Sequence, residues 1–311
     1  MGDSLGASVS VNAKSISVLT FLSAAYMLLS CFLVGYKGDE VVLIVLCNSL
    51  FYISPATRKF ILGFAIFLVY WIIFDYMKAF PNYNYNTVHI AGLYNFEKNL
   101  FGIHYQGKLI TVNEYWQINH RPLIDVITGL FYLCWIPVPL GFAAYLFFSN
   151  KRHFLYFALT FFTVNLLGFV VYYMYPAAPP WYVQYHGFRF IANTPGNTGG
   201  LARFDSYFHA NIFKSIYAKG SNVFAAMPSL HSSYPVIVVY YGFKNKLGWV
   251  NAVFITVMLG IWFTAVYASH HYIVDVLSGI VCAIAGISLF NFITRFKPVK
   301  LFLNKYETII S

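Results

Sequence analysis

The chain has 311 residues, of which 59% are hydrophobic and only 10% are charged. Soluble globular domains usually carry about 25% charged residues, so the composition excludes an ordinary soluble protein and indicates an integral membrane protein. The formal net charge is +10, and its distribution along the chain points to membrane topology and not to a nucleic-acid partner. The four cysteines lie in apolar runs without a CxxC pair, and we interpret them as buried thiols, neither disulfides nor metal ligands.

Apolar runs of about 17–25 residues predict helices that span a bilayer. In chain order, six such runs occupy Ser15–Tyr36, Phe60–Tyr76, Ile124–Phe148, Phe154–Tyr175, Leu247–Ser269 and Tyr272–Ile293. Two shorter runs, Val41–Ser54 and Pro228–Phe243, bring the expected number of spans to eight. The predicted fold is all-α, a polytopic membrane helix bundle of about eight transmembrane helices.

With eight spans, most basic residues fall on one side of the membrane. The termini and short connections on that side carry eleven Lys and Arg residues against two acids. These basic residues are Lys14, Arg58, Lys59, Lys151, Arg152, Lys244, Lys246, Arg295, Lys297, Lys300 and Lys305. The other side, with long segments at about 78–123 and 176–228, carries nine basic residues against eight acids. Short loops rich in Lys and Arg stay cytoplasmic, so the long segments are expected on the non-cytoplasmic face, periplasmic or lumenal. If Val41–Ser54 does not span, only the N-terminus changes side.

The second long segment is rich in proline, glycine and aromatic residues. PAAPPWY at 176–182 is followed by PGNTGGLARFD at 195–205. Adjacent prolines stiffen the chain just outside a predicted span. We therefore expect a lid or substrate pocket here, and the alternative is a mobile surface connection. The residues assigned to it are Pro179, Pro180, Trp181, Tyr182, Gly199 and Gly200.

Two segments on the expected outer face carry histidines where a predicted helix begins. MPSLHSS contains His231, and SHHYIVD contains His271 and Asp275. His271 and Asp275 are four residues apart and share a helix face. A carboxylate there can accept a hydrogen bond from one imidazole nitrogen and leave the other free to react. An ionised residue within an apolar helix costs about 2.5–3.5 kcal/mol on insertion scales, so Asp275 is expected to have a partner, and His271 is the obvious one.

Three other interpretations fit parts of this pattern. A capping cluster at a helix start would be purely structural, but two histidine-bearing segments on one face of the membrane argue against it. A metal site is not expected, because His270 points about 100° away from His271 on a helix and no Cys or acidic cluster joins them. A membrane transporter with a His–Asp relay would need ionisable residues through the membrane depth, and few are found.

MPSLHSS also has the features of a phosphate site. Ser229 and Leu230 precede or open a helix, where free backbone N–H groups and the helix dipole favour an anion. Arginine is the usual partner of phosphoryl oxygens. On the outer face, Arg121 in HRPLID and Arg203 in GGLARFD are candidates, and His270 is assigned with them to the headgroup-binding set.

These motifs resemble the type 2 phosphatidic acid phosphatase superfamily, whose pattern is KxxxxxxRP, then PSGH, then SRxxxxxHxxxD. PSLH at 228–231, followed about forty residues later by HHYxxD, carries the likeness. HRPLIDVITGLFYLCWIP at 120–137, PAAPPWY, PGNTGGLARFD and FAAMPSLHSS are similar to the inositol phosphorylceramide synthase branch. The similarity covers roughly residues 115–295.

The chain departs from the superfamily pattern at several positions. Glu114 stands where the pattern has Lys, and Thr264 and Ala265 stand where it has Ser and Arg. Leu230 replaces Gly. The phosphate clamp of the general pattern is therefore incomplete, and Arg203 is expected to substitute for the missing residues. The branch that the chain resembles tolerates such losses.

The resemblance implies an organisation in three parts. These are an N-terminal transmembrane hairpin at 1–56, a phosphatidic acid phosphatase-like catalytic core with six helices at 57–295, and a basic cytoplasmic tail at 296–311. It also implies a metal-independent enzyme without a cofactor, acting at His231, His271 and Asp275.

The mechanism that the resemblance implies is headgroup transfer. His271, oriented by Asp275, attacks the phosphorus of a phospholipid and forms a phosphohistidine, while His231 protonates the leaving diacylglycerol oxygen. His231 then deprotonates the incoming hydroxyl. With phosphatidylinositol as donor and ceramide as acceptor, the product is inositol phosphorylceramide. With water as acceptor and a phosphatidyl or prenyl phosphate monoester as substrate, the same site is a lipid phosphate phosphatase, and the sequence leaves both open. The expected partners are a phospholipid donor, a lipid-hydroxyl acceptor and the membrane; the pattern specifies neither an accessory membrane subunit nor a homo-oligomer.

Overall fold

The computed structural model describes residues 11–218, 220 and 222–311. The chain separates into two compact units. One contains Met1–Phe80, Ala143–Phe162 and Phe290–Ser311, and the other contains Pro81–Phe142 and Thr163–Leu289. The three-part organisation expected from the sequence stays a prediction.

The described residues contain six helical segments that are long and apolar enough to cross a membrane. They are Ala13–Leu33, Pro55–Ala79, Pro122–Ser149, Lys151–Met174, Val250–Tyr267 and Ile273–Ile293. Each matches one of the six predicted runs, so the prediction of an all-α membrane bundle is confirmed. The two shorter runs are also helical, as α2 (Gly38–Ile53) and α12 (Leu230–Lys244). Both are shorter than the roughly 20 residues that cross a bilayer, and whether α2 spans stays a prediction.

The third predicted span is confirmed as Pro122–Ser149, but it is interrupted. It divides into α6 (Pro122–Leu133) and α7 (Pro137–Ser149), and the sequence analysis did not predict this interruption. The reason for the interruption is Pro137, which has no N–H to donate to the carbonyl one turn earlier and disfavours helical geometry in the residue before it. The interruption leaves Cys134 and Trp135 between the two helices.

The first unit is built from α1 (Ala13–Leu33), α2, α3 (Pro55–Tyr76), the adjoining ends of α7 and α8 (Lys151–Met174), and α15. Helix α3 begins with a capping box at Ser54 and a proline in its first turn, which is a typical N-terminal signal. The basic segment predicted only as a tail contains the helix α15 (Lys297–Ile310). It packs on α3, where the Tyr306 hydroxyl donates to the carbonyl of Leu62 at 2.8 Å.

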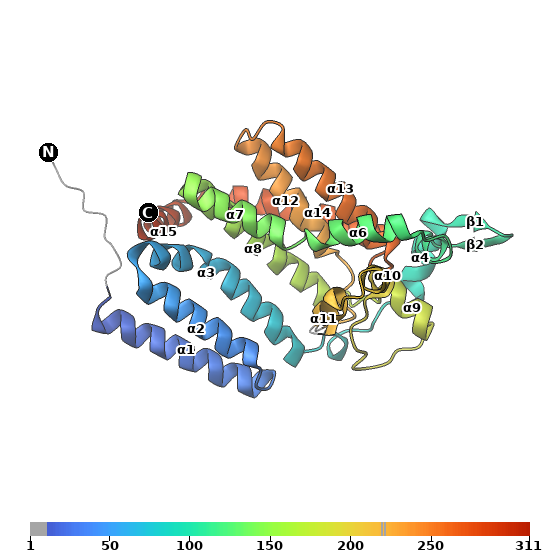
Figure 1. The fold of residues 1–311 in the computed structure, drawn as a ribbon, viewed down its shortest axis with the longest axis horizontal. Coiled ribbons are helices and arrows are strands. Elements are labelled where there is room, and N and C mark those ends of the chain that lie inside the picture. Colours follow the sequence, from blue (N-terminus) through green and yellow to red (C-terminus); the bar gives the residue numbers. More distant parts are fainter. Residues whose placement is uncertain (1–10, 219, 221) are drawn as a thin grey trace. The chain divides into compact units, whose positions relative to one another are not determined.

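The second unit carries both histidine motifs. Helices α12, α13 (Val250–Tyr267) and α14 (Ile273–Ile293) follow one another through short connections. Helix α13 packs against α12 and α6, and also against α5 (Val112–Ile118) from the first long segment (Figure 1). The α13–α14 connection is thereby enclosed by elements from distant parts of the sequence.

The two long segments between spans contain ordered secondary structure. The first holds the 3-10 turns η1 (Met77–Ala79) and η2 (Asn82–Asn84), then α4 (Ala91–Phe101), the antiparallel hairpin of β1 (Ile103–Tyr105) and β2 (Lys108–Ile110), and α5. The second holds α9 (Pro180–His186), the 3-10 turn η3 (Gly199–Leu201), α10 (Ala202–Tyr207) and α11 (Ile212–Ala218). In the hairpin, Gln106 and Gly107 both have positive φ, as a two-residue turn between twisted strands requires.

Two buried clusters fix these segments against the helix starts. In one, Leu93 and Ala177 pack with Ala226, Tyr272 and Val274. The other consists of Tyr132, Leu201, Phe204, Phe213 and Ala268. Because both clusters include residues next to a histidine motif, packing of the long segments and placement of the motifs depend on each other.

Candidate active site

The structure brings His231 and His271 together. His231 is the second residue of α12, and His271 lies in the connection between α13 and α14. Nδ1 of His231 lies 3.2 Å from Nε2 of His271. Two short segments that are forty residues apart in sequence thus form one pair of imidazoles at the start of their helices.

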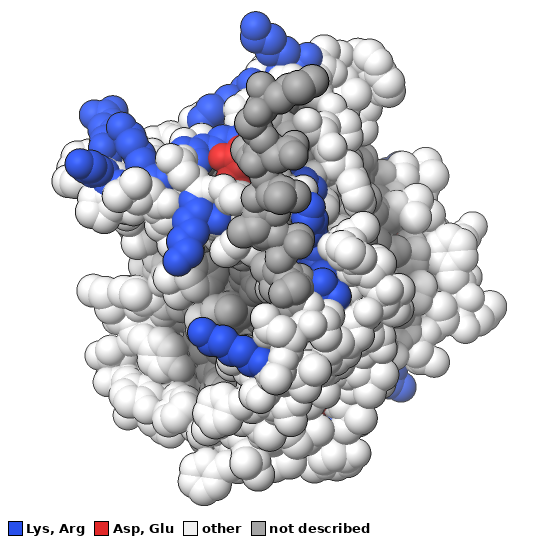
Figure 2. Space-filling view, turned by 90° about the vertical axis from the view of Figure 1, so that its left-hand side faces the viewer, with Lys and Arg blue, Asp and Glu red and all other residues white. Residues whose placement is uncertain are grey.

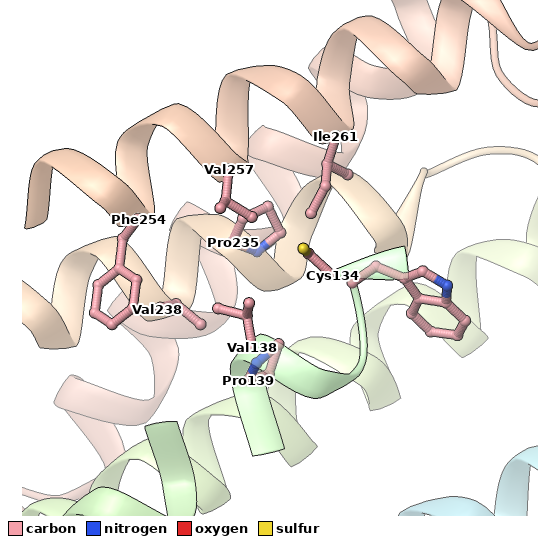
Figure 3. A pocket seen from close by; sticks show the side chains of 9 residues that line it. Cys134, Val138, Pro139, Pro235, Val238, Phe254, Val257 and Ile261 are labelled. Atoms are coloured by element: carbon pink, nitrogen blue, oxygen red, sulfur yellow. The ribbon is translucent and has the colours of Figure 1, made fainter. Parts of the chain in front are cut away.

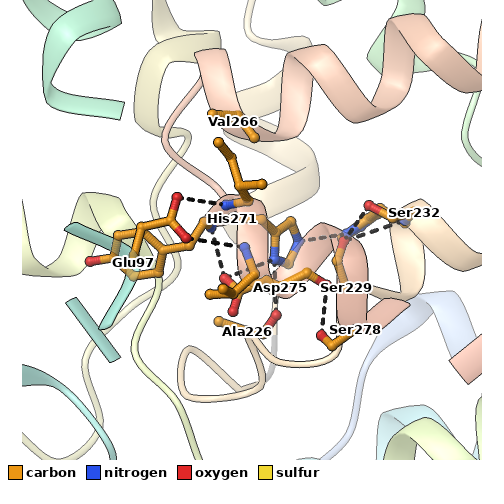
Figure 4. A network of polar contacts seen from close by, with 12 residues as sticks. Glu97, Ala226, Ser229, Ser232, Val266, His271, Asp275 and Ser278 are labelled. Carbon is orange, nitrogen blue, oxygen red and sulfur yellow. Dashed lines mark hydrogen bonds and ion pairs between the residues drawn. The ribbon is translucent and has the colours of Figure 1, made fainter. Parts of the chain in front are cut away.

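The orientation of His271 is set by a backbone carbonyl. Its Nδ1 lies 2.9 Å from the carbonyl oxygen of Ala226 and 3.8 Å from Oδ2 of Asp275. A carbonyl can only accept, so Nδ1 carries the hydrogen and Nε2 presents its lone pair to His231. The hydrogen bond expected between the imidazole and Asp275 is therefore replaced by one to Ala226 (Figure 4).

The carboxylate of Asp275 instead accepts a hydrogen bond from the backbone at the start of its own helix. Its Oδ2 accepts the backbone N–H of Tyr272 at 2.8 Å, and its side chain is fully buried. The first amides of a helix have no acceptor within the helix, so a carboxylate in the first turn satisfies one of them. Oδ1 of Asp275 has no hydrogen-bond partner among the described residues.

Two buried side chains that the sequence analysis missed hold the same connection. Both carboxylate oxygens of Glu97 in α4 accept amides of α14, from Ile273 at 3.0 Å and Val274 at 3.1 Å (Figure 4). The amide of Asn113 in α5 donates to the carbonyls of Val266 and His271 at 2.8 and 2.9 Å. No sequence motif marks Glu97 or Asn113, because each acts on backbone far away in the chain.

Burial controls the protonation of this region. It lowers the pKa of His271 to about 4, against which the hydrogen bond to Ala226 acts in the opposite direction. Burial also lowers the pKa of His270 well below its ordinary value. The same cause raises the pKa of Glu97, partly offset by the two amides that it accepts. Histidine 271 is therefore neutral at physiological pH, as a nitrogen nucleophile must be.

His270, predicted to bind the headgroup, anchors the second long segment. Its ring stacks on Tyr217 with centroids 4.6 Å apart and on Tyr132 at 5.5 Å. Its Nε2 donates to the carbonyl of Thr198 at 2.8 Å. The His270 ring is thereby bonded to the main chain of the second long segment, one residue before Gly199.

Gly199 and Gly200, predicted as part of a lid, lie against the backbone that precedes the histidines. The N–H of Gly200 donates to the carbonyl of Ala268 at 2.8 Å. A Cβ on Gly199 would stand 2.5 Å from that same carbonyl oxygen, and one on Gly200 would stand 2.9 Å from the Ala268 Cα. Only glycine allows the two backbones to approach this closely.

The PAAPPWY segment contacts the same connection. Pro179 is the N-cap of α9 and Pro180 its first residue. The N–H of Trp181 donates to the carbonyl of Ser269 at 3.0 Å. The Trp181 and Tyr182 side chains lie in a buried cluster with Phe224, so they support the site from within the protein and do not face an open pocket.

Arg203 and Arg121 occupy different environments. Nε of Arg203 pairs with Oδ1 of Asp125 at 2.6 Å, and its NH2 nitrogen is buried with no hydrogen-bond partner among the described residues. Asp125 also accepts from the hydroxyl of Tyr267 at 2.8 Å. The side chain of Arg121 is exposed, while its backbone N–H donates to Tyr267. Asp125, which the sequence analysis did not select, thus positions the arginine expected to complete the clamp.

Ser229 and Leu230 open α12. Ser229 is its N-cap: its hydroxyl accepts the N–H of Ser232, and its own N–H donates to the carbonyl of Asp275 at 2.9 Å. Its side chain is therefore committed to the cap, and the anion donors at this position are the amides of the first turn. Leu230 is buried against Gly168, where a Cβ would stand 2.6 Å from the leucine side chain.

Comparison with known proteins identifies the family. A family model described as PAP2 superfamily matches residues 106–289, which is more than half of the chain. The chain belongs to the PAP2 superfamily. The matched region includes both histidines, Asp275, Arg121 and Arg203.

Curated relatives of this PAP2 superfamily chain narrow the resemblance to one branch. The phosphoinositol dihydroceramide synthase of Bacteroides thetaiotaomicron is 43% identical over 300 residues, covering 96% of this chain and 98% of that protein. The inositol phosphorylceramide synthase of Candida albicans is 32% identical over 190 residues, 56% of this chain and 38% of that protein. The catalytic subunit of the inositol phosphorylceramide synthase of Saccharomyces cerevisiae is 34% identical over 118 residues, covering 37% of this chain and 29% of that protein. The predicted resemblance to the synthase branch is confirmed. No solved structure matches the chain.

The departures from the superfamily pattern have structural explanations. Glu114 forms the capping box of α5 with Thr111 and accepts the hydroxyl of Tyr94 at 3.0 Å. Thr264 is fully buried and donates to backbone carbonyls of α6 and α13. These positions serve helix packing here, so phosphate binding must use other residues. Among the described residues, no group of three or more His, Cys, Asp or Glu is arranged to hold a metal ion.

Proposed function

We propose that this protein transfers a phosphoinositol headgroup from phosphatidylinositol to the primary hydroxyl of a ceramide or dihydroceramide. The full-length similarity to a bacterial synthase supports the substrate class. The observation that carries the chemistry is the 3.2 Å contact between the two imidazoles, together with the carbonyl that fixes the His271 tautomer. A neutral, oriented imidazole beside a second imidazole is the arrangement that nucleophilic catalysis with acid–base assistance needs.

In the first half-reaction, Nε2 of His271 attacks the phosphorus of phosphatidylinositol. An N–P bond forms, the bond between phosphorus and the glycerol oxygen breaks, and protonated His231 gives its proton to that oxygen. Burial, and then the neighbouring His271, lower the pKa of His231 to about 3. The bound phosphodiester anion acts in the opposite direction and favours the protonated form of His231. The products are diacylglycerol and a phosphoinositol group on His271.

In the second half-reaction, the primary hydroxyl of the acceptor takes the place of diacylglycerol. His231 accepts its proton, the oxygen attacks phosphorus, and the N–P bond breaks to restore His271. The same imidazole serves both oxygens because both approach phosphorus from the side opposite the nucleophile. Proton transfer of this kind contributes about 10²–10⁴-fold to a rate.

Substrate binding must open the histidine pair. A reacting atom stands about 3–3.5 Å from its nucleophile before attack, and that space beside Nε2 of His271 is closed by His231. The His231 ring lies edge-on to Trp135, with centroids 4.5 Å apart. We infer that the headgroup displaces the His231 ring from this contact.

The phosphoryl oxygens are proposed to lie between Arg203 and the first turn of α12. The buried NH2 nitrogen of Arg203 has two hydrogens without an acceptor among the described residues, which is costly unless a ligand supplies one. The amides of Leu230 and His231 are the free donors of a helix N-terminus. Arg121, with an exposed side chain, can approach the headgroup from outside.

The active site is proposed to face the non-cytoplasmic side. His231 opens α12, whose last residue is Lys244, and His271 precedes α14, which is followed by Arg295. Within the first unit, Lys59 contacts the carbonyl of Ser311 and Arg152 pairs with Glu307. Figure 2 shows a surface with many Lys and Arg side chains and little acidic area, as the positive-inside rule favours for a cytoplasmic face.

The test is a competition between the two acceptors. Purified protein is given labelled phosphatidylinositol in mixed micelles, with and without ceramide, and lipid and water-soluble products are measured. We expect inositol phosphorylceramide to dominate once ceramide is present, and EDTA to leave the rate unchanged. Release of inositol phosphate to water at every ceramide level would favour the phosphatase alternative instead.

A further inference from the structure

Helix α15 (Lys297–Ile310) lies at the end of the first unit where two membrane spans begin. Nζ of Lys59, near the start of α3, donates to the backbone oxygen of Ser311 at 2.6 Å. NH1 of Arg152, the second residue of α8, lies 3.1 Å from Oε2 of Glu307. Figure 1 shows α15 foreshortened while α1, α2 and α3 run lengthwise across the picture, so α15 crosses these helices and does not run along them.

One face of α15 packs on the protein. Leu303 and Ile310 are both fully buried. They are seven residues apart, so they differ by only about 20° around the helix axis. Tyr306, which donates to the carbonyl of Leu62, lies between them in sequence. This face fixes the orientation of α15, so the directions of its other side chains are set.

A second face of α15 is apolar and is left uncovered by the described residues. The Phe302 side chain is 54% exposed, and Ile309, about 20° away around the axis, is half-buried. Pro298 is exposed and lies about 40° from Phe302. Leu301, toward the outer side, is exposed as well. An apolar edge of this kind fits the boundary between lipid headgroups and acyl chains.

The opposite side of α15 is polar and basic. Lys300 and Asn304 lie about 160° from Phe302 around the axis, and Lys297 lies about 140° from it. Lys305 lies about 60° from Phe302, where its long stem can carry the ammonium group toward the headgroups. All three lysines are exposed, and none forms an ion pair with a described acidic side chain.

The surface around α15 has the same sign of charge. The first unit also contributes Lys14, Lys59, Lys151, Arg152 and Arg295. Figure 2 looks onto this end and shows many Lys and Arg side chains with little acidic area. Basic residues next to a membrane attract the anionic lipids of the adjoining leaflet.

We propose that α15 lies in the headgroup layer of the membrane and binds anionic phospholipids there. Phe302 and Ile309 enter the acyl boundary, and the lysines of α15 contact lipid phosphates. The occupant is a lipid surface because α15 crosses the starts of two spans, which places it at the bilayer boundary, and because its apolar and charged edges lie on opposite sides. The proposal is independent of the proposed function, since α15 lies outside the family match at 106–289.

The depth of α15 is tested with a bimane fluorophore on the full-length protein in phospholipid nanodiscs. In a background without native cysteines, the label is placed at Phe302→Cys or Thr308→Cys. Thr308 is the matched control, because it is exposed on the same helix about 120° from Phe302. We expect brominated lipid to quench the label at 302 and aqueous iodide to quench the label at 308. Equal iodide quenching at both positions would overturn the proposal. Protection of position 302 from both quenchers would place a second copy of the chain on this edge and overturn it as well.

The preference for anionic lipid is tested with the same label at 302. Quenching by brominated phosphatidylglycerol is compared with quenching by brominated phosphatidylcholine at equal mole fraction. We expect phosphatidylglycerol to quench more strongly, and the ratio to fall by up to about fivefold for each of Lys297→Gln, Lys300→Gln and Lys305→Gln. Lys108→Gln, at an exposed lysine of β2, is the charge control and should keep the ratio.

Arginine at the same three positions keeps the charge and should keep the preference. If the arginine variant loses as much as the glutamine variant, the loss comes from packing and the proposal is overturned. Equal quenching by the two lipids with all three lysines present would also overturn it.

Discussion

Gly199→Ala should lower activity strongly without changing any of the side chains proposed to be catalytic. Gly199 has φ of +51°, which costs an alanine about 1–2 kcal/mol. Its new Cβ would stand 2.5 Å from the Ala268 carbonyl oxygen, whereas ordinary contact begins at 3.4 Å, so the two backbones must separate by about 0.9 Å. Ala268 is two residues before His270 and three before His271. A misplacement of about 1 Å costs about 10²-fold in rate, and we expect kcat to fall by that order.

The matched control for this variant is Gly248→Ala. Gly248 has φ of +57° and no atom within 4 Å of an added Cβ. It therefore carries the same backbone cost without the collision, and it should lower thermal stability while leaving kcat unchanged. The measurements are headgroup transfer in mixed micelles and thermal unfolding of both variants. Equal kcat in Gly199→Ala and Gly248→Ala would refute the argument that the contact positions the histidines.

Three further predictions follow from the site and its topology. His231→Ala and His271→Ala should each lose about 10²–10⁴-fold of activity, and only variants that keep His271 should trap labelled phosphate on the protein. Near-normal turnover of His271→Ala would remove its assignment as nucleophile. The acid limb of kcat/KM should lie well below pH 6.5, because burial lowers the pKa of His271 to about 4. Between pH 6.5 and 4 the unfolded chain binds a proton at His271 that the folded chain excludes. The free energy of unfolding should therefore decrease as pH falls from 6.5 toward 4. An acid limb at or above pH 6.5 would contradict this. In a background without native cysteines, Asn150→Cys and Ala192→Cys should react with an impermeant reagent from opposite sides of the membrane, and labelling from one side would exclude the topology.

The sequence alone predicted the membrane spans and the two histidine motifs. Long apolar runs form helices in a bilayer because the backbone must satisfy its own hydrogen bonds there. The histidine motifs were found because their residues are close together in sequence. Glu97 was not found, because it accepts amides 176 and 177 residues away, and no local pattern encodes such a partner. The interruption after Leu133, which Figure 3 shows at Cys134, was missed because the run stays apolar across Pro137, although that proline was a visible signal.

The composition of the PAAPPWY segment predicted that its backbone is ordered, but it did not predict where its side chains point. The prolines of PAAPPWY predicted a stiff segment, and the structure has the short helix α9 there. The sequence did not indicate that Trp181 would be buried and bonded through its backbone to Ser269. An aromatic residue in an outer loop fits either a lid or a core, and only the long-range packing with Phe224 decides between them.

The α13–α14 connection explains why this chain can depart from the superfamily pattern and keep the histidine pair. Three elements hold it through backbone atoms: α9 at the Ser269 carbonyl, η3 at the Ala268 carbonyl and α5 at the His271 carbonyl. The amides of His270 and His271 both donate to the carbonyl of Ala265, whatever side chain that residue carries. These two hydrogen bonds therefore do not depend on the side chain at 265, although Ala265 itself is fully buried and packs with Val266 and Val276. The strict requirement moves to the residues that permit close backbone approach, above all Gly199 and Gly200, whose Cβ atoms would collide with Ala268. Ala265→Gly, which keeps the carbonyl and adds no volume to the core, should accordingly be far milder than the loss of either glycine.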